Sequence, residues 1–205
     1  MRLLLDLLFP PRADEIIVRK IVDDEFLALV APRLVPTTHP EVVSLLPLND
    51  PCVRGAIHEA KYHGNTRAFD LLALALSEYL SDCEDMGCTT SHIFLVPVPL
   101  GKKREKERGF NQVEEIAKRA GKRLDIAVDT ELLIRTRETV SQVSLPRERR
   151  VENMRNAFGI AHVPDPLCTY VVVDDVTTTG ATLQAAIDTL TNAGATHIIP
   201  LALAH

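Results

Sequence analysis

The sequence has few cysteines, and their spacing argues against a structural zinc site. They are Cys52, Cys83, Cys88 and Cys168. No two have the C-x-x-C spacing of zinc ribbons, since even Cys83 and Cys88 are five residues apart. We therefore expect reduced thiols rather than a metal centre.

Long hydrophobic runs and an excess of positive charge are also missing. The apolar opening stretch, residues 3–9, is short, contains Asp6 and is followed by Pro10 and Pro11. It fits neither a secretion signal nor a membrane span. The formal net charge of −5 disfavours direct nucleic-acid binding. We expect a cytoplasmic protein without membrane contact.

The two common nucleotide-binding motifs, G-x-x-x-x-G-K-[ST] and G-x-G-x-x-G, are absent. A different pattern stands in their place. Three valines, residues 171–173, run directly into Asp174 and Asp175, and a turn rich in threonine follows. This order is typical of a central parallel strand whose carboxyl end opens onto a ligand site. A buried strand with an ordinary polar turn would explain the valines but not the paired acids.

The turn after the acids is suited to holding a phosphate. It consists of Thr177, Thr178, Thr179, Gly180, Ala181 and Thr182. Hydroxyl groups, a glycine that permits close approach and the N–H groups that begin the next helix can together bind an anion. The two carboxylates would repel a bare anion, but they suit the vicinal hydroxyls of a ribose and its magnesium. Phosphoribosyl pyrophosphate (PRPP) combines all of these groups.

Strand and helix patterns alternate along the rest of the chain. Strand patterns occur at 92–98, 170–173 and 197–204, and helical patterns at 68–80, 112–120 and 182–193. We expect Gly121 and Gly194 to end the last two helices as left-handed caps. Residues 13–30 also have helical spacing, which prolines then break. This alternation favours an α/β fold with a parallel central sheet.

A second candidate site follows the strand at 92–98. Its cations are Lys102, Lys103, Arg104, Lys106 and Arg108, which we expect in a loop before the next helix. Such positive charge suits a pyrophosphate, although a solvated surface run is an equal alternative for Lys103, Arg104 and Lys106 taken singly. Beyond them, Gly109 permits an unusual backbone angle and Asn111 fits a helix N-cap. Arg108 can bind a phosphate or carboxylate through two parallel hydrogen bonds.

The acidic phosphate motif closely resembles the signature of the type I phosphoribosyltransferases. The chain as a whole resembles the ComF family of amidophosphoribosyltransferase-like proteins, a group tied to DNA uptake in competent bacteria. Beside the acidic motif, the likeness rests on the opening that ends in Phe9-Pro10-Pro11, on residues 57–64, 96–100 and 108–112, and on Arg135, Arg137, Thr139, Gln142, Leu145, Arg150, Asn153 and Phe158. It covers most of the sequence.

The resemblance implies a type I phosphoribosyltransferase fold, with a mostly parallel sheet flanked by helices. It implies a phosphoribosyltransferase domain at residues 51–205 behind an N-terminal helical appendage, or hood, at residues 1–50. Family members commonly carry a four-cysteine zinc ribbon after the Phe-Pro-Pro, whereas this chain has no cysteine before Cys52. We expect the helical stretch at 13–30 to take the place of that module.

The resemblance also implies an enzyme that transfers the phosphoribosyl group of PRPP, bound with Mg²⁺, to an unidentified nitrogen acceptor. Asp174 and Asp175 would bind the ribose hydroxyls and stabilise the transition state, and residues 177–182 would hold the 5-phosphate. Leu100, Gly101, Lys102, Arg104 and Arg108 would meet the pyrophosphate. Ligand oxygens and water would hold most of the magnesium shell, with the two acids nearby and no direct protein ligand.

Residues 135–155 are polar, rich in arginine and broken by Pro146. This composition favours a mobile lid over a plain surface loop. Its candidate residues are Arg135, Arg137, Thr139, Gln142 and Arg150. In the motif at 57–64, Lys61 either contacts pyrophosphate or covers the sheet edge, and we expect Tyr62 to be structural.

Two other functions stay open. The protein could bind PRPP or a nucleotide without turnover, as a regulator, since the chain has no readable acceptor motif. It could also be an adaptor in DNA uptake, with residues 102–108 touching nucleic acid, although no aromatic side chain interrupts those cations. A homo-oligomer is compatible with each function. Because apolar residues fix the strand, we expect asparagine at positions 174 and 175 to leave the fold largely intact.

Overall fold

The computed structural model describes residues 11–85, 92–137, 154 and 156–205 of the chain. In chain order the elements are α2 (Ala13–Lys20), α3 (Asp23–Leu27), β1 (Arg33–Val35), β2 (Val42–Leu46), α4 (Pro51–His63), α5 (Thr66–Asp85), β3 (Ile93–Pro97), α6 (Lys102–Arg108), α7 (Gln112–Leu124), β4 (Ala127–Val128), β5 (Leu133–Arg135), β6 (Phe158–Ile160), β7 (Thr169–Val176), α9 (Ala181–Asn192) and β8 (His197–Ala204). The predicted strands and most of the predicted helices are among them.

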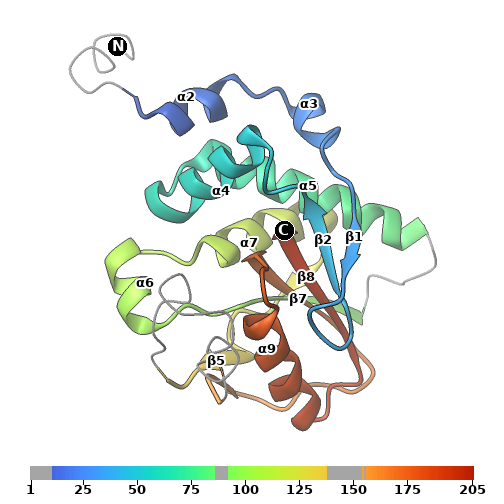
Figure 1. Ribbon diagram of the computed structural model, residues 1–205. Helices are drawn as coiled ribbons and strands as arrows, with labels where there is room; N and C mark the ends of the chain where they lie inside the picture. Colours follow the sequence, from blue (N-terminus) through green and yellow to red (C-terminus); the bar gives the residue numbers. More distant parts are fainter. Residues whose placement is uncertain (1–10, 86–91, 138–153, 155) are drawn as a thin grey trace.

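The central sheet has six strands in the order β1-β2-β8-β7-β3-β4 (Figure 1). Strand β1 pairs antiparallel with β2 at one edge, and the other pairings are parallel. Strands β5 and β6 form a separate antiparallel pair. The prediction of an α/β fold with a mostly parallel sheet is confirmed. Because β7 lies between β3 and β8, its carboxyl end is enclosed by two neighbouring strands.

Alternate side chains of β7 enter two hydrophobic cores on opposite faces of the sheet. Val171 and Val173 pack in the core shared with α4, α5 and α7. Tyr170 and Val172 pack in the core shared with α9 and the β5–β6 pair. Figure 1 shows these layers, with α4, α5 and α7 above the sheet and α9 below it. Burial on both faces explains why this strand reads as an unbroken apolar run.

Local signals in the sequence fix the ends of the helices that carry the site. Asp50 caps α4, because its carboxylate accepts hydrogen bonds from the backbone N–H groups of Cys52 and Val53. The left-handed Gly64 ends the same helix. Asn111 caps α7 by accepting a bond from the N–H of Val113, as predicted.

The N-terminal region differs from the predicted helix over residues 13–30. It forms two short helices, α2 and α3, because the backbone is extended at Ile21 and Val22. Residues 33–35 and 42–46 were expected in the helical appendage, but they form β1 and β2 of the central sheet. The domain boundary at residue 50 stays a prediction, and the sheet begins before it.

The predicted cap at Gly121 is wrong. Helix α7 continues to Leu124, and Asp125 adopts the left-handed conformation, with φ of 56°. Gly121 lies inside the helix, where an added Cβ would stand 2.6 Å from the carbonyl oxygen of Ile126. This glycine therefore permits the returning chain to pack against the helix. The other predicted cap, Gly194, does have a positive φ, of 109°.

Replacing Gly121 by alanine is expected to lower the free energy of unfolding by about 1–3 kcal/mol, because the new methyl group meets backbone. The matched control is Gly55→Ala in α4, where a Cβ would lie at ordinary contact distance, 3.7 Å from Ile17. The control should be neutral or stabilising by about 0.5–1 kcal/mol through helix propensity. Urea unfolding measures both, and equal effects would contradict the packing argument.

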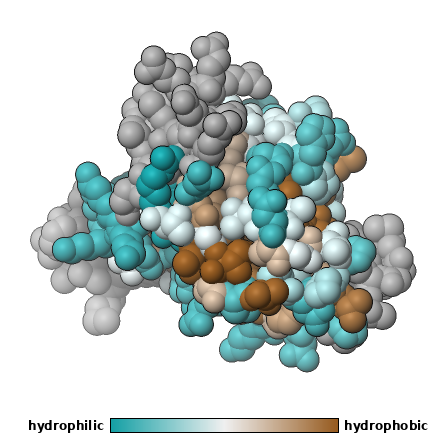
Figure 2. Space-filling view, turned by 90° about the horizontal axis from the view of Figure 1, so that it is seen from below, coloured by the Kyte–Doolittle hydropathy of each residue, from teal (hydrophilic) through white to brown (hydrophobic). Residues whose placement is uncertain are grey.

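Figure 2 shows the surface from below, on the side of α9 and the β5–β6 pair. Hydrophobic atoms gather near the middle of this face and hydrophilic ones surround them. Among the residues whose placement is described, Val163 and Leu167 are the most exposed large hydrophobic side chains, at 80% each. Among the described residues, no helix has both the length and the hydrophobicity needed to cross a bilayer.

Candidate functional site

The two acids end the buried part of β7, as predicted, but their surroundings differ. Asp175 is buried, with 6% of its surface exposed, and Asp174 is half-buried. Asp174 lines a small open pocket together with the turn that follows the strand. The carboxyl end of the strand therefore presents one acid to the pocket.

The carboxylate of Asp175 is held by three hydrogen bonds. Its Oδ2 accepts from Lys61 Nζ at 2.9 Å and from Gln112 Nε2 at 2.7 Å. Its Oδ1 accepts from the backbone N–H of Val176 at 2.7 Å. Burial alone would raise the pKa of Asp175, but the Lys61 ammonium and these bonds outweigh burial and lower it. Asp175 is therefore a paired, ionised group.

Asp174 has a much less favourable environment for its charge. Its Oδ1 accepts one hydrogen bond, from the backbone N–H of Asp175 at 2.8 Å. Burial, followed by the neighbouring Asp175 charge, raises the pKa of Asp174 to about 7. A carboxyl group that titrates near neutrality can accept hydrogen bonds from hydroxyls or take up a proton at working pH.

The predicted phosphate loop encloses the rest of the pocket. Its lining consists of Asp174, Val176, Thr177, Thr178, Thr179, Gly180, Ala181, Thr182 and Leu183. The loop leads into α9, whose N-terminus carries the positive end of the helix dipole. Within the described part of the chain, the hydroxyl oxygens of Thr177 and Thr179 are buried without a hydrogen-bond partner. Unpaired buried hydroxyls are rare, and an anion in the pocket could satisfy them.

Sequence reasoning missed Thr37, which belongs to the turn between β1 and β2. An added Cβ on Gly180 would lie 2.6 Å from the Thr37 carbonyl oxygen and 2.7 Å from its Oγ1. The hydroxyl of Thr37 is buried and, among the residues placed here, has no partner. The only local signal was a pair of threonines between Pro36 and Pro40. The β1–β2 turn thus forms a wall behind the phosphate loop.

The basic part of the predicted pyrophosphate loop is helical rather than a loop. Residues 102–108 form α6, which ends at the left-handed Gly109. Leu100, Lys102 and Arg135 line one cavity of about 230 Å³. Gly101, buried, precedes the helix, and Arg104 Nη2 is buried without a partner among the described residues. The fold therefore brings part of the loop together with Arg135 from the predicted lid.

Arg108 does not reach this cavity's lining. Its Nη1 donates to Gln112 Oε1 at 2.9 Å, and its guanidinium stacks 5.2 Å from the centre of the exposed Tyr62 ring. The motif at 108–112 is thereby explained by structure. Gln112 holds Asp175, while Asn111 Nδ2 donates to the Val98 carbonyl and ties α7 to the end of β3.

Two of the predicted lid residues are described. Arg135 ends β5 and stacks on the ring of Phe158 in β6, with 5.1 Å between the guanidinium and the ring centre. Arg137 follows it and is exposed. Thr139, Gln142 and Arg150 lie outside the described residues, as does the Leu-rich opening stretch. The lid stays a prediction.

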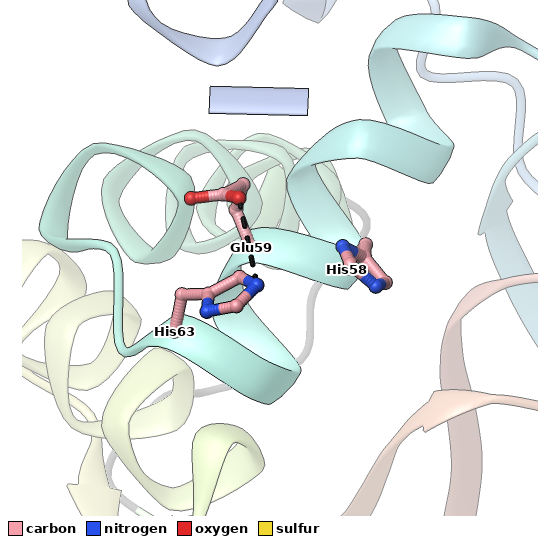
Figure 3. Close-up of side chains that lie close together, drawn as sticks. All are labelled: His58, Glu59 and His63. Atoms are coloured by element: carbon pink, nitrogen blue, oxygen red, sulfur yellow. Dashed lines mark ion pairs between the residues drawn. The ribbon is translucent and has the colours of Figure 1, made fainter. Parts of the chain in front are cut away.

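A second cluster, on α4, offers three metal-ligand types (Figure 3). Atoms of His58, Glu59 and His63 lie within 4.8 Å of one another. The buried Glu59 carboxylate, however, accepts from Arg12 Nε at 3.0 Å and from Arg12 Nη2 at 2.9 Å. A metal ion would have to displace this guanidinium. The cluster instead fastens the start of α2 to α4, where His58 also contacts Asp14 at 3.0 Å.

Comparison with known proteins gives a consistent set of relatives. No family model matches the chain. It is 37% identical over 101 residues to DNA utilization protein YhgH of Escherichia coli, covering 49% of this chain and 44% of that protein. It is 35% identical over 92 residues to Competence protein F of Haemophilus influenzae, covering 44% and 40%. It is 32% identical over 140 residues to YhgH of Salmonella typhimurium, covering 68% and 61%.

The chain thus spans about half the length of the curated relatives it matches. The similarity supports the expected kinship with the ComF family. The relatives are named for DNA utilization and competence, and these names concern those proteins.

Proposed function

We propose that this protein binds PRPP with magnesium at the carboxyl edge of its sheet and transfers the phosphoribosyl group to a nitrogen acceptor. The observation that carries the proposal is the pocket shared by Asp174 and residues 177–182. A carboxyl group, a helix N-terminus and two buried hydroxyls without partners in the described chain meet there. Few ligands other than a sugar phosphate use all three.

The parts of PRPP can be assigned to neighbouring groups. The 5-phosphate would take the threonine loop, where charge-assisted hydrogen bonds contribute about 1.5–3 kcal/mol each. The ribose hydroxyls would reach Asp174. The pyrophosphate would lie toward the cavity lined by Leu100, Lys102 and Arg135. Carboxylate oxygens suit magnesium, so the ion would bind mostly through ligand oxygens and water near the acids.

In the transfer step, the bond between C1 of the ribose and the pyrophosphate oxygen breaks as a bond to the acceptor nitrogen forms. The nitrogen loses a proton, and pyrophosphate leaves with the electron pair. Positive charge develops on the sugar, where a nearby carboxylate stabilises it. Lys102 and Arg135 line the cavity of about 230 Å³ together with Glu105 and Glu114, and these two cations would face the leaving group.

A second candidate function is supported by the relatives' names. The site would bind PRPP or a nucleotide without turnover, and the protein would act as a regulator or adaptor in DNA uptake. A pyrophosphate-release assay with amines and nucleobases separates the two functions. Release above background supports transfer, whereas tight PRPP binding without release supports the regulator. Salt-dependent binding of single-stranded DNA would favour the adaptor.

Thr177→Val provides the sharpest test of the phosphate loop. Valine has nearly the same shape and removes only the buried hydroxyl, so the fold should be retained. PRPP affinity in the presence of magnesium should fall about tenfold, the loss of one charge-assisted hydrogen bond. Isothermal titration calorimetry measures the change.

Ser44→Ala is the matched control for Thr177→Val. The hydroxyl of Ser44 in β2 is also buried and without a partner in the described chain, but it does not line the pocket. Its removal should leave PRPP affinity unchanged. Equal affinities for Thr177→Val and the unmodified protein would contradict the assignment, and no binding by the unmodified protein would overturn the proposed function.

A further inference from the structure

The two adjacent carboxylates have different numbers of free acceptor positions. A carboxylate has about four lone-pair positions. Asp175 uses three of them, for Lys61, Gln112 and the N–H of Val176. Asp174 accepts from the N–H of Asp175 through Oδ1 and lines the pocket, which Asp175 does not. The site therefore offers a ligand one carboxylate rather than two.

We infer that Asp174 alone binds the ligand's hydroxyls, and that Asp175 is an internal clamp that Lys61 and Gln112 hold in place. This division of roles deepens the proposed function and rests on it. It makes Lys61 a positioning residue, which acts on the ligand through the charge of the acid pair. The sequence motif at residues 57–64 thereby joins the site through one side chain.

The hydrogen-bond directions around Gln112 support the clamp. Arg108 donates to Gln112 Oε1 at 2.9 Å, so this oxygen is already used as an acceptor. The amide nitrogen of Gln112 then faces Asp175 Oδ2 at 2.7 Å and needs an acceptor there. Lys61 brings a second donor to the same oxygen at 2.9 Å. One of the two converging donors is an ammonium, which pairs more strongly with a charged oxygen than with the neutral amide oxygen of asparagine.

The clamp joins three helices to the end of β7. Lys61 comes from α4, Arg108 from α6 and Gln112 from α7. Lys61 and Gln112 bind Asp175 directly, whereas Arg108 binds Gln112. Asp175 is mostly buried, and the Lys61 side chain is 26% exposed. Removing the Asp175 charge would leave the Lys61 ammonium without its buried partner. The clamp therefore fixes the strand end from which Asp174 projects.

The charged groups around the two acids also give them different roles. The charged groups that act on Asp174 are Asp175, Lys61 and Arg135. Lys61 keeps Asp175 ionised, and the Asp175 charge in turn makes ionisation of Asp174 unfavourable. An ionised Asp174 is the better acceptor for ribose hydroxyls, so PRPP affinity should rise as pH increases through 7.

The test compares Asp174→Asn, Asp175→Asn and Lys61→Met with the unmodified chain, by thermal unfolding and by calorimetry with PRPP and magnesium from pH 5.5 to 8.5. Asp174→Asn should fold and bind PRPP at least about tenfold more weakly, without pH dependence beyond that of the ligand. Lys61→Met should shift the rise in affinity to higher pH, because loss of a nearby cation raises carboxyl pKa values. Lys61→Arg should restore the original profile.

Asp175→Asn should lower the melting temperature. If it unfolds, Gln112→Leu tests the clamp in its place, since leucine removes one donor but leaves the Lys61 pair. Asp175→Asn with an unchanged melting temperature and a loss of affinity equal to that of Asp174→Asn would overturn the inference. So would a Lys61→Met profile identical to that of the unmodified chain.

Carboxyl ¹³C NMR separates this inference from the proposed function, because it needs no ligand. The Asp174 signal should titrate near neutrality and the Asp175 signal well below it. A chain that fails to bind PRPP but shows this order would defeat the proposed function alone. The reverse order, with Asp175 titrating higher, would defeat the division of roles alone.

Discussion

Gly180→Ala is expected to lower the free energy of unfolding by about 2–5 kcal/mol and to abolish ligand binding at the phosphate loop. Gly180 has φ of 71°, a conformation that costs a residue with a Cβ about 1–2 kcal/mol. The new Cβ would also stand 2.6 Å from the carbonyl oxygen of Thr37. Neither the loop nor the β1–β2 turn can relax without moving the other, so the two costs add.

Gly109→Ala separates these two costs. Gly109 has a similar φ, of 81°, but an added Cβ would meet nothing within 4 Å. This variant should lose only the conformational part, about 1–2 kcal/mol. Urea unfolding of both variants gives the difference, which measures the contact between Gly180 and Thr37. Equal losses would show that Thr37 does not press on the phosphate loop.

The part of the site that is continuous in the sequence could be predicted from it. The strand, the acids and the threonine loop follow one another in the chain, and each has a strong local signal. Buried valines fix the strand, and the turn must leave it at the sheet edge. That Gly180 admits a phosphate stays a prediction, and the structure shows that this glycine has a left-handed conformation in the loop. Its close neighbour, however, is Thr37, on a distant part of the chain.

Contacts between distant segments could not be predicted in this way. Strands β1 and β2 are short and have prolines around them, so the sequence there favours turns over strands. Lys61 lies on a helix, and nothing local indicates that it faces Asp175. The basic run at 102–108 reads as a loop beside prolines and a glycine, yet it is helical because lysine, arginine and glutamate all favour helix.

Asp174→Asn is expected to stabilise the protein at pH 8 by up to about 4 kcal/mol and to have little effect near pH 4. The reason is the raised pKa of Asp174, about 7, against an ordinary value of 3.8. A raised pKa means that the folded chain holds this proton more tightly than the unfolded chain. The resulting stability is present below pH 3.8 and is lost as pH rises to about 7. Asparagine has no charge to bury and avoids this loss of stability, but it should bind the ligand more weakly.

Asp175→Asn should act in the opposite direction, although the two residues are adjacent. Lys61 and Gln112 lower the pKa of Asp175 despite its burial, so its stabilisation is present above its ordinary pKa and disappears as pH falls below it. At pH 7 the variant removes the hydrogen-bonded carboxylate partner of the partly buried Lys61 ammonium and should lose about 3 kcal/mol, which revises the expectation that both acids are dispensable for folding.

Urea unfolding of both variants from pH 4 to 8.5 checks these signs together. The Asp174→Asn difference should grow with pH and level off above 7, whereas the Asp175→Asn difference should stay nearly constant over this range. Two curves of the same sign would mean that the pKa values of the two acids are not shifted in opposite directions. Lys61 would then not distinguish the two acids, and the electrostatic part of the division of roles would be wrong.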